Sequence, residues 1–166
     1  MLIEKTIKDF LTHRENYIQP DEANNLDLPR ISKIDFDGNI HINSEKKTKT
    51  KMITVKNNDF VISGINLIKG AAAINKMGDA IATIHYSSYY INDKKIYVPF
   101  FDLFVKSQKF KDILNEKKRS GIKTEIRSSD FLNLKIQIPD SIEKQEKISE
   151  EINKQLAKIS YLKSLL

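Results

Sequence analysis

The sequence predicts an α+β fold: a mixed, β-rich domain at residues 1–139, followed by one long helix at residues 140–166. Residues 30–98 hold short apolar runs separated by turn pairs such as Asp37-Gly38, which is typical of short strands joined by tight turns. In the last segment, apolar residues recur at alternating steps of three and four, which is typical of a helix. A chain of 166 residues, 40% of them hydrophobic, is long enough for one domain with its own core.

The N-terminal third is predicted to contain a helix, a loop and a hairpin. Leu2–Leu11 has apolar residues on one helical face, so we expect a short amphipathic helix there. Thr12–Pro29 is polar and holds two prolines, which predicts a long loop. Arg30–Ile42 alternates isoleucines around Asp37-Gly38, which predicts a β-hairpin.

The middle of the chain is predicted to continue as strands and then to turn helical. Two strands are expected around the turn at residues 57–59, and apolar β-like runs surround Gly70 and Gly78. The segment Pro99–Gly121 begins and ends with residues suited to helix ends, and Ser107 divides it into two helices by capping the second. Phe131–Ile138 alternates apolar and polar residues, which predicts a half-buried strand.

The C-terminal helix is predicted to begin at an acidic capping box made by Asp140 and Glu143. Beyond it, apolar residues repeat with the a and d spacing of a coiled coil, and Gln145 and Gln155 take two of the same positions, where they would fix register. Because a small domain does not need a helix this long to cover itself, we expect the helix to pair with another helix. The residues expected to bind the partner are Ile148, Ile152, Ile159, Leu162 and Leu166. An amphipathic helix packed on its own domain is the alternative.

The excess positive charge lies in two short segments. The whole chain carries 28 Lys and Arg against 22 Asp and Glu, a net charge of +6. Residues 46–56 hold five lysines and no acid, and residues 106–127 hold eight basic and three acidic residues. Clustered cations bind polyanions because phosphate neutralisation releases counterions, so these clusters favour a nucleic-acid partner over ordinary solvated surface.

The surface that contacts nucleic acid is therefore expected in both basic segments and in a tyrosine-rich stretch between them. Base reading is placed on the Thr12–Pro29 loop and on residues 86–90, with core packing of one or two tyrosines as the alternative. The predicted DNA-binding residues are Lys46, Lys47, Lys49, Lys51, Lys69, Tyr86, Tyr89, Tyr90, Lys117, Lys118, Arg119, Lys123 and Arg127.

No catalytic or metal-binding motif is found. The chain has no Cys, its three His are scattered, and it lacks the glycine-rich phosphate loops and the nucleophile elbow. Asp140 and the acids and lysines after it superficially resemble the Asp and Glu-x-Lys set of nucleases, but here a helix cap and solvent-facing charges explain them. We expect no cofactor and no metal. No apolar run reaches the length of a membrane span, and a cytoplasmic location is expected.

The junction LNLKIQIPDSIEKQEKISEEI resembles the strand-to-helix signature of the specificity subunits of type I restriction–modification enzymes. Leu132, Leu134, Ile136, Ile138 and Pro139 match it, together with Ile148, while Lys144-Gln145 stands where Glu-Gln is usual. The stretches KDILNEKKRSGIKTEIRSSDFLNL and NDFVISGINLIKGAAAI are similar to two further parts of the same family.

The resemblance implies one target-recognition domain and one spacer helix, where family members usually carry two of each. Such subunits have no active site. They read one half of a bipartite duplex DNA sequence, and they dock methyltransferase and endonuclease subunits, while their spacer helices form a coiled coil. The chain is then either a half-length subunit, which would pair with a second copy or a second specificity half, or a fragment or inactive remnant of a longer subunit. Two other interpretations stay open: a small magnesium-dependent nuclease, and a helix-mediated scaffold with incidental basic loops.

Overall fold

The computed structural model describes residues 1–43, 47–119 and 125–166, without the side chain of Arg119. Its helices are α1 (Pro20–Asn25), α2 (Val98–Val105), α3 (Gln108–Arg119), α4 (Ser128–Leu132) and α5 (Ile142–Ser164), with short 3-10 helices η1 (Ile7–Asp9) and η2 (Leu67–Lys69). Its strands are β1 (Leu2–Thr6), β2 (Leu11–Arg14), β3 (Tyr17–Ile18), β4 (Ile31–Ile34), β5 (Ile40–Ile42), β6 (Met52–Val55), β7 (Phe60–Ser63), β8 (Ala72–Ile74), β9 (Ala80–Thr83), β10 (Tyr86–Ile91) and β11 (Lys135–Pro139). The α+β class predicted from the sequence is confirmed.

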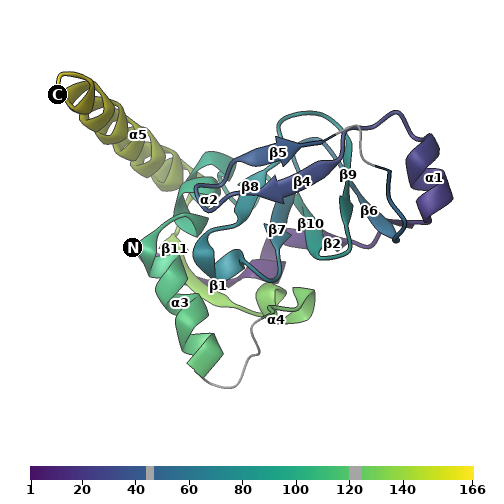
Figure 1. Ribbon diagram of the computed structural model, residues 1–166. Helices are drawn as coiled ribbons and strands as arrows, with labels where there is room; N and C mark the ends of the chain where they lie inside the picture. The colour runs from purple at the N-terminus through teal and green to yellow at the C-terminus, as the bar shows by residue number, and fades with distance from the viewer. Residues whose placement is uncertain (44–46, 120–124) are drawn as a thin grey trace.

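The strands form small antiparallel sheets rather than one large one. β2, β10, β7 and β8 make a four-stranded sheet, and β3, β6 and β9 make a three-stranded sheet. The β4–β5 hairpin and the β1–β11 pair stand separately. In Figure 1, α1 lies at one end of this body, and α5 projects away from it at the other.

An aromatic core holds the four-stranded sheet against α2, α3 and α4. Phe60, Tyr89, Phe101, Phe110 and Phe131 are all at most 1% exposed. The Phe60 and Phe101 rings meet edge to face at 4.9 Å between centroids, which is a favourable arrangement for aromatic pairs. A second, aliphatic cluster lies beneath the β4–β5 hairpin, and it is built on Ile31, Ile34, Ile53, Val55 and Val61 together with small alanines.

The predictions for the N-terminal third were wrong in two places. Leu2–Leu11 is not a helix, because Leu2–Thr6 forms a strand that pairs antiparallel with β11. This pairing satisfies backbone hydrogen bonds of both strands. Thr12–Pro29 is not a loop, since it includes the end of β2, all of β3 and α1, whose first residue is Pro20. Long-range pairing therefore overrode the local helical spacing.

Several other predictions are confirmed. The predicted β4–β5 hairpin forms, and α2 and α3 are separated at Ser107, whose Oγ accepts a hydrogen bond from the Phe110 amide at 3.3 Å. Residues 52–55 and 60–63 are strands, although they belong to different sheets. β11 begins at Lys135, four residues after the predicted start, because Phe131 is buried in α4.

The long C-terminal helix is present, but its cap differs from the prediction. Ser141 rather than Asp140 caps α5, and its Oγ accepts a hydrogen bond from the Lys144 amide at 3.2 Å. Asp140 instead pairs with the Lys144 ammonium at 2.6 Å, which lowers the pKa of Asp140. Within the described ranges, no helix is long and apolar enough to cross a membrane.

Candidate nucleic-acid interface

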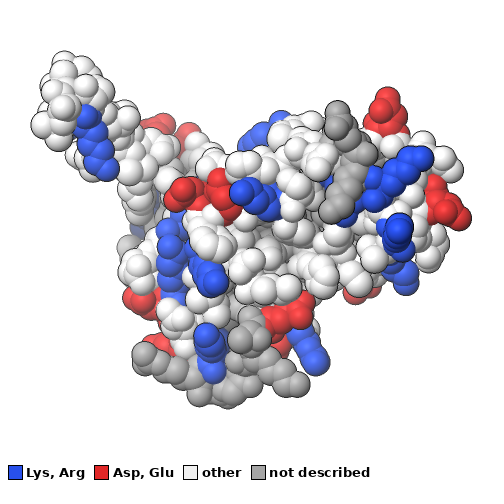
Figure 2. All heavy atoms as spheres, viewed as in Figure 1, with Lys and Arg blue, Asp and Glu red and all other residues white. Residues whose placement is uncertain are grey.

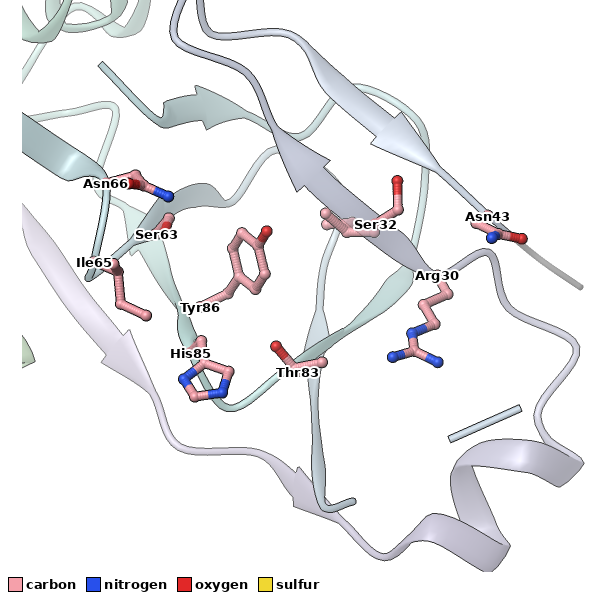
Figure 3. A pocket seen from close by; sticks show the side chains of 10 residues that line it. Arg30, Ser32, Asn43, Ser63, Ile65, Asn66, Thr83, His85 and Tyr86 are labelled. Carbon is pink, nitrogen blue, oxygen red and sulfur yellow. The ribbon is translucent and has the colours of Figure 1, made fainter. Parts of the chain in front are cut away.

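A polar hollow of about 320 Å³ lies between the β4–β5 hairpin and the loops that follow β7 and β9 (Figure 3). Its side chains come from four separate parts of the chain. They are Arg30, Ile31, Ser32, Asn43, Ser63, Ile65, Asn66, Thr83, His85 and Tyr86. The sheets of the body thus gather residues that are up to 56 positions apart.

Backbone pairing explains how these residues come together. The Asn43 amide donates to the Arg30 carbonyl at 2.9 Å, so the two ends of the hairpin lie side by side. Tyr86 lies opposite Ser63 in the β10–β7 register, and the Gly64 amide donates to the His85 carbonyl at 3.2 Å. The loops after β7 and β9 are therefore held against each other at one edge of the hollow.

The chemistry of the hollow suits an anionic or hydrogen-bonding ligand. Among the residues that the structure describes, its lining contains a guanidinium, two amides, hydroxyl groups and an imidazole, but no carboxylate. Burial raises the pKa of Tyr86, so its phenol keeps its proton and remains a hydrogen-bond donor. Arg, Asn and hydroxyl side chains are the groups that contact phosphate oxygens and base edges in protein–DNA complexes.

The first basic segment lies next to α1. Lys47, Lys49 and Lys51 are exposed, while Lys46 lies outside the described residues. Asn24 of α1 holds this segment through two hydrogen bonds to the Thr48 backbone, each 2.9 Å long. The exposed lysines therefore lie on a segment that is hydrogen-bonded to α1.

The second basic segment is divided between α3 and α4. Lys117 and Lys118 are exposed near the end of α3, and Arg127 is exposed just before α4. Lys123 and the Arg119 side chain lie outside what the structure describes. Figure 1 places α1 and α3 at different ends of the body, and the blue atoms in Figure 2 form separate groups there. The two lysine clusters are thus not brought together, although the Ile126 amide, next to Arg127, donates to the Gly64 carbonyl at 3.1 Å, beside the hollow.

The predicted tyrosines take three different positions. Tyr86 lines the hollow, and Tyr90 is 48% exposed with the Arg14 guanidinium 5.7 Å from its ring centroid. Tyr89 is fully buried, and its hydroxyl donates to Ser128 Oγ at 3.0 Å, so this residue belongs to the core and its side chain is not available to DNA. Burial raises the pKa of Tyr89. Lys69 is exposed and lies 5.5 Å from the Phe36 ring centroid.

Most of the hollow was missed at the level of sequence. Arg30, Asn43, Asn66 and His85 were not among the predicted residues, because each follows or precedes a short strand and has the composition of an ordinary turn. Only the antiparallel pairing of distant strands shows that they share one surface.

A second hollow, of about 440 Å³, is less suited to a polyanion. It is lined by Arg14, Lys76 and Tyr90 but also by Asp59 and Asp93. Asp59 is 2% exposed and lies 2.6 Å from the Arg14 guanidinium, so the cation is already paired there.

The acidic residues at the start of α5 form ion pairs on the helix surface. Besides the Asp140 pair with Lys144, Glu143 pairs with Lys147 at 3.1 Å, four residues along the same helix. The part of the chain that the structure describes contains no group of three potential metal ligands. The residues that resemble a nuclease set thus form ion pairs at the start of α5.

The partner-binding residues predicted on α5 are all exposed. Ile148, Ile152, Ile159, Leu162 and Leu166 are at least 39% exposed, and the helix that carries them projects from the body in Figure 1. The apolar stripe therefore has no cover within the described chain. Gln145 differs from these residues, because it is 2% exposed and its side chain is hydrogen-bonded to its own domain. It is therefore not exposed for contact with a partner helix.

No protein-family model matches this sequence, and no curated protein is significantly similar to it. Solved structures do match its fold. The crystal structure of the HsdS subunit from Thermoanaerobacter tengcongensis is 12% identical with a TM-score of 0.77, covering 99% of this chain and 44% of that one. A chain from a study of complex assembly and conformational transition of the type I R-M system is 11% identical with a TM-score of 0.75, covering 98% and 45%.

The S subunit of a type I restriction–modification system from M. genitalium also matches, with 13% identity, a TM-score of 0.55, and coverage of 99% of this chain and 44% of that one. The chain thus has the fold of the specificity subunits of type I restriction–modification systems. More particularly, it spans slightly less than half the length of the neighbours it matches.

Proposed function

We propose that this chain is a half-length specificity subunit that binds one half of a bipartite duplex DNA target. The observation that carries the proposal is the fold match, because nearly the whole chain superposes on 44–45% of specificity subunits. Residues 1–139 form the target-recognition domain, and residues 140–166 form the spacer helix. The protein works without a cofactor of its own.

The polar hollow and the lysines beside α1 form the DNA-binding surface. The lysines contact phosphates and supply sequence-independent affinity, while the hollow and its rim loops make the contacts that depend on sequence. The guanidinium, amide and hydroxyl groups of the described lining support this assignment, since such groups contact phosphates and base edges.

The stripe on α5 binds a second copy of the chain. Water disfavours so many exposed Ile and Leu side chains, and pairing would bury them. Residues 142–151 hold four Glu and two Lys, whereas residues 152–166 hold three Lys and no acid. An antiparallel pair places the acidic half of each helix against the basic half of its partner, whereas a parallel pair opposes like charges.

Methyltransferase and endonuclease subunits complete the proposed assembly. One structural neighbour comes from a study of complex assembly in a type I R-M system, which supports partners of this kind. Binding of purified methyltransferase subunit to this chain, measured by calorimetry, tests that part of the proposal separately.

A salt titration tests the DNA surface. We expect duplex binding to weaken steeply with salt, and Lys47→Ala with Lys49→Ala to flatten the slope by about 0.9 for each lysine that neutralises a phosphate. Extending the change to Lys46 and Lys51 should flatten it further. Lys94→Ala with Lys95→Ala is the matched control, because both lysines are exposed but lie outside the proposed surface. An equal effect of both double variants would contradict the assignment.

A further inference from the structure

The first turns of α5 are attached to the domain through a buried glutamine. Gln145 is 2% exposed, and its amide makes two hydrogen bonds to backbone groups outside the helix. Nε2 donates to the Pro139 carbonyl at 3.0 Å, and Oε1 accepts from the Tyr97 amide at 2.8 Å. Pro139 ends β11 and Tyr97 precedes α2, so one side chain links α5 to two separate parts of the domain.

These two bonds need both ends of an amide. A carboxylate in place of Gln145 keeps an acceptor for Tyr97 but has no donor for Pro139, and an apolar side chain has neither. Leaving the Tyr97 amide and the Pro139 carbonyl without partners is unfavourable. A glutamine amide satisfies both groups, because it has a donor and an acceptor. Ser149, which is 1% exposed, is the only other buried residue of α5. Its hydroxyl donates a hydrogen bond to the main-chain carbonyl of Gln145 at 2.6 Å.

Beyond Ser149, the helix has no buried residue that would hold its direction. Every residue from 150 to 166 is exposed. The 15 helical residues from 150 to 164 extend about 22 Å at 1.5 Å per residue, so a tilt of about 10° at the attachment moves the tip by about 4 Å. That displacement is about one base-pair step of DNA, which is 3.4 Å along one strand.

We infer that Gln145 is a positioning residue that fixes the direction in which α5 leaves the domain, and thereby the spacing between the two half-sites that a pair of chains reads. The inference rests on the proposed function for its DNA consequence, but its structural part does not. Gln145 contacts no DNA and belongs to no binding surface. It acts through the orientation of α5.

The direction of α5 can be measured without DNA. Because the chain has no cysteine, Lys33→Cys on β4 and Lys158→Cys on α5 provide two specific sites for spin labels. Mixed with excess unlabelled chain, the doubly labelled protein should give one narrow distance distribution by electron–electron double resonance. Gln145→Met, which keeps volume but removes both bonds, should broaden it. Asn153→Met should not, because Asn153 is exposed on the same helix and lies outside its apolar stripe.

A second arm measures spacing on DNA. The DNA target is first obtained by selection from a random duplex library, and it is then made with the spacer between its half-sites one base pair shorter or longer. The unmodified chain should prefer one spacer length. Gln145→Met should lose that preference while it keeps its affinity for a single half-site. If Gln145→Met does not fold, Gln145→Glu, which retains the bond to Tyr97, takes its place. A broad distance distribution in the unmodified chain, or a narrow one in the folded variant, would overturn the inference. If no chain binds DNA specifically, the proposed function fails, and the distance measurement still decides the role of Gln145.

Discussion

Asp59 connects three parts of the domain through one buried carboxylate. Its Oδ2 lies 2.6 Å from Arg14 Nε of β2, and it accepts hydrogen bonds from Ser88 Oγ at 2.8 Å and from the Lys56 amide at 3.2 Å. Sequence patterns placed Asp59 in a turn, and it does follow the turn at residues 57–58, but its partners on β2 and β10 depend on sheet pairing. A carboxylate buried to this extent is tolerated only because these partners satisfy it.

Asp59→Ala should therefore destabilise the domain strongly. The change leaves the Arg14 guanidinium, the Ser88 hydroxyl and the Lys56 amide without their shared acceptor. Removing one partner of a buried pair costs about 3–5 kcal/mol, and because Arg14 is partly exposed we expect about 2–3 kcal/mol here. Urea denaturation measures the free energy of unfolding. Asp93→Asn is the matched control, since Asp93 is exposed at the same hollow, and an equally small effect of both changes would contradict this role.

The β4–β5 hairpin carries a pH-dependent contribution to stability. His41 Nε2 lies 2.8 Å from Asp35 Oδ2, and this contact together with hydrogen bonds from the Asn39 and Asp37 amides lowers the pKa of Asp35. A carboxyl group with a lowered pKa stabilises the folded state above its unfolded pKa of about 4, and that contribution declines as the pH falls below it.

We accordingly expect Asp35→Asn to lower stability at neutral pH and to matter progressively less below about pH 4. Thermal unfolding of both proteins between pH 7 and pH 3 tests this expectation. A stability difference that stays constant across this range would show that the Asp35 charge contributes nothing to the hairpin.

At the scale of elements, the sequence predicted what local patterns determine. The β4–β5 hairpin follows from Asp37-Gly38, and the division of α2 from α3 follows from Ser107 as a cap. Leu2–Thr6 was assigned wrongly because its apolar spacing fits a helix, whereas its actual partner, β11, lies more than 120 residues away. The start of α5 was misplaced by one residue, because Asp140 and Ser141 are both good caps and only the structure distinguishes them.

The exposed stripe of α5 predicts self-association. Ile152→Asp with Ile159→Asp should give a folded monomer, because each aspartate would have to be buried without a partner in the helix pair. Asn153→Asp with Ser160→Asp is the matched control, since both residues are exposed and each follows a residue of the apolar stripe without belonging to it. Sedimentation at high micromolar concentration distinguishes the two. A monomeric unmodified chain would contradict the pairing.

At the scale of the molecule, the domain and its C-terminal helix carry two separate surface features. The polar hollow lies on the body of the domain, and the apolar stripe lies on α5, which projects from that body in Figure 1. In the proposed assembly, DNA binding and chain pairing would use separate surfaces, so two chains could pair while each still presents its hollow. The fold class and the helix were predictable from periodicity. The hollow was not, because it exists only where four distant segments meet.

The most direct test of this account is selection of bound duplexes from a random library by the unmodified chain, followed by sequencing. A half-length specificity subunit that pairs through α5 should enrich a two-fold symmetric motif interrupted by a spacer of constant length. The Ile152→Asp and Ile159→Asp variant should enrich only a single half of that motif. Enrichment of no motif, with binding that depends on salt but not on sequence, would contradict the central claim that this chain reads DNA.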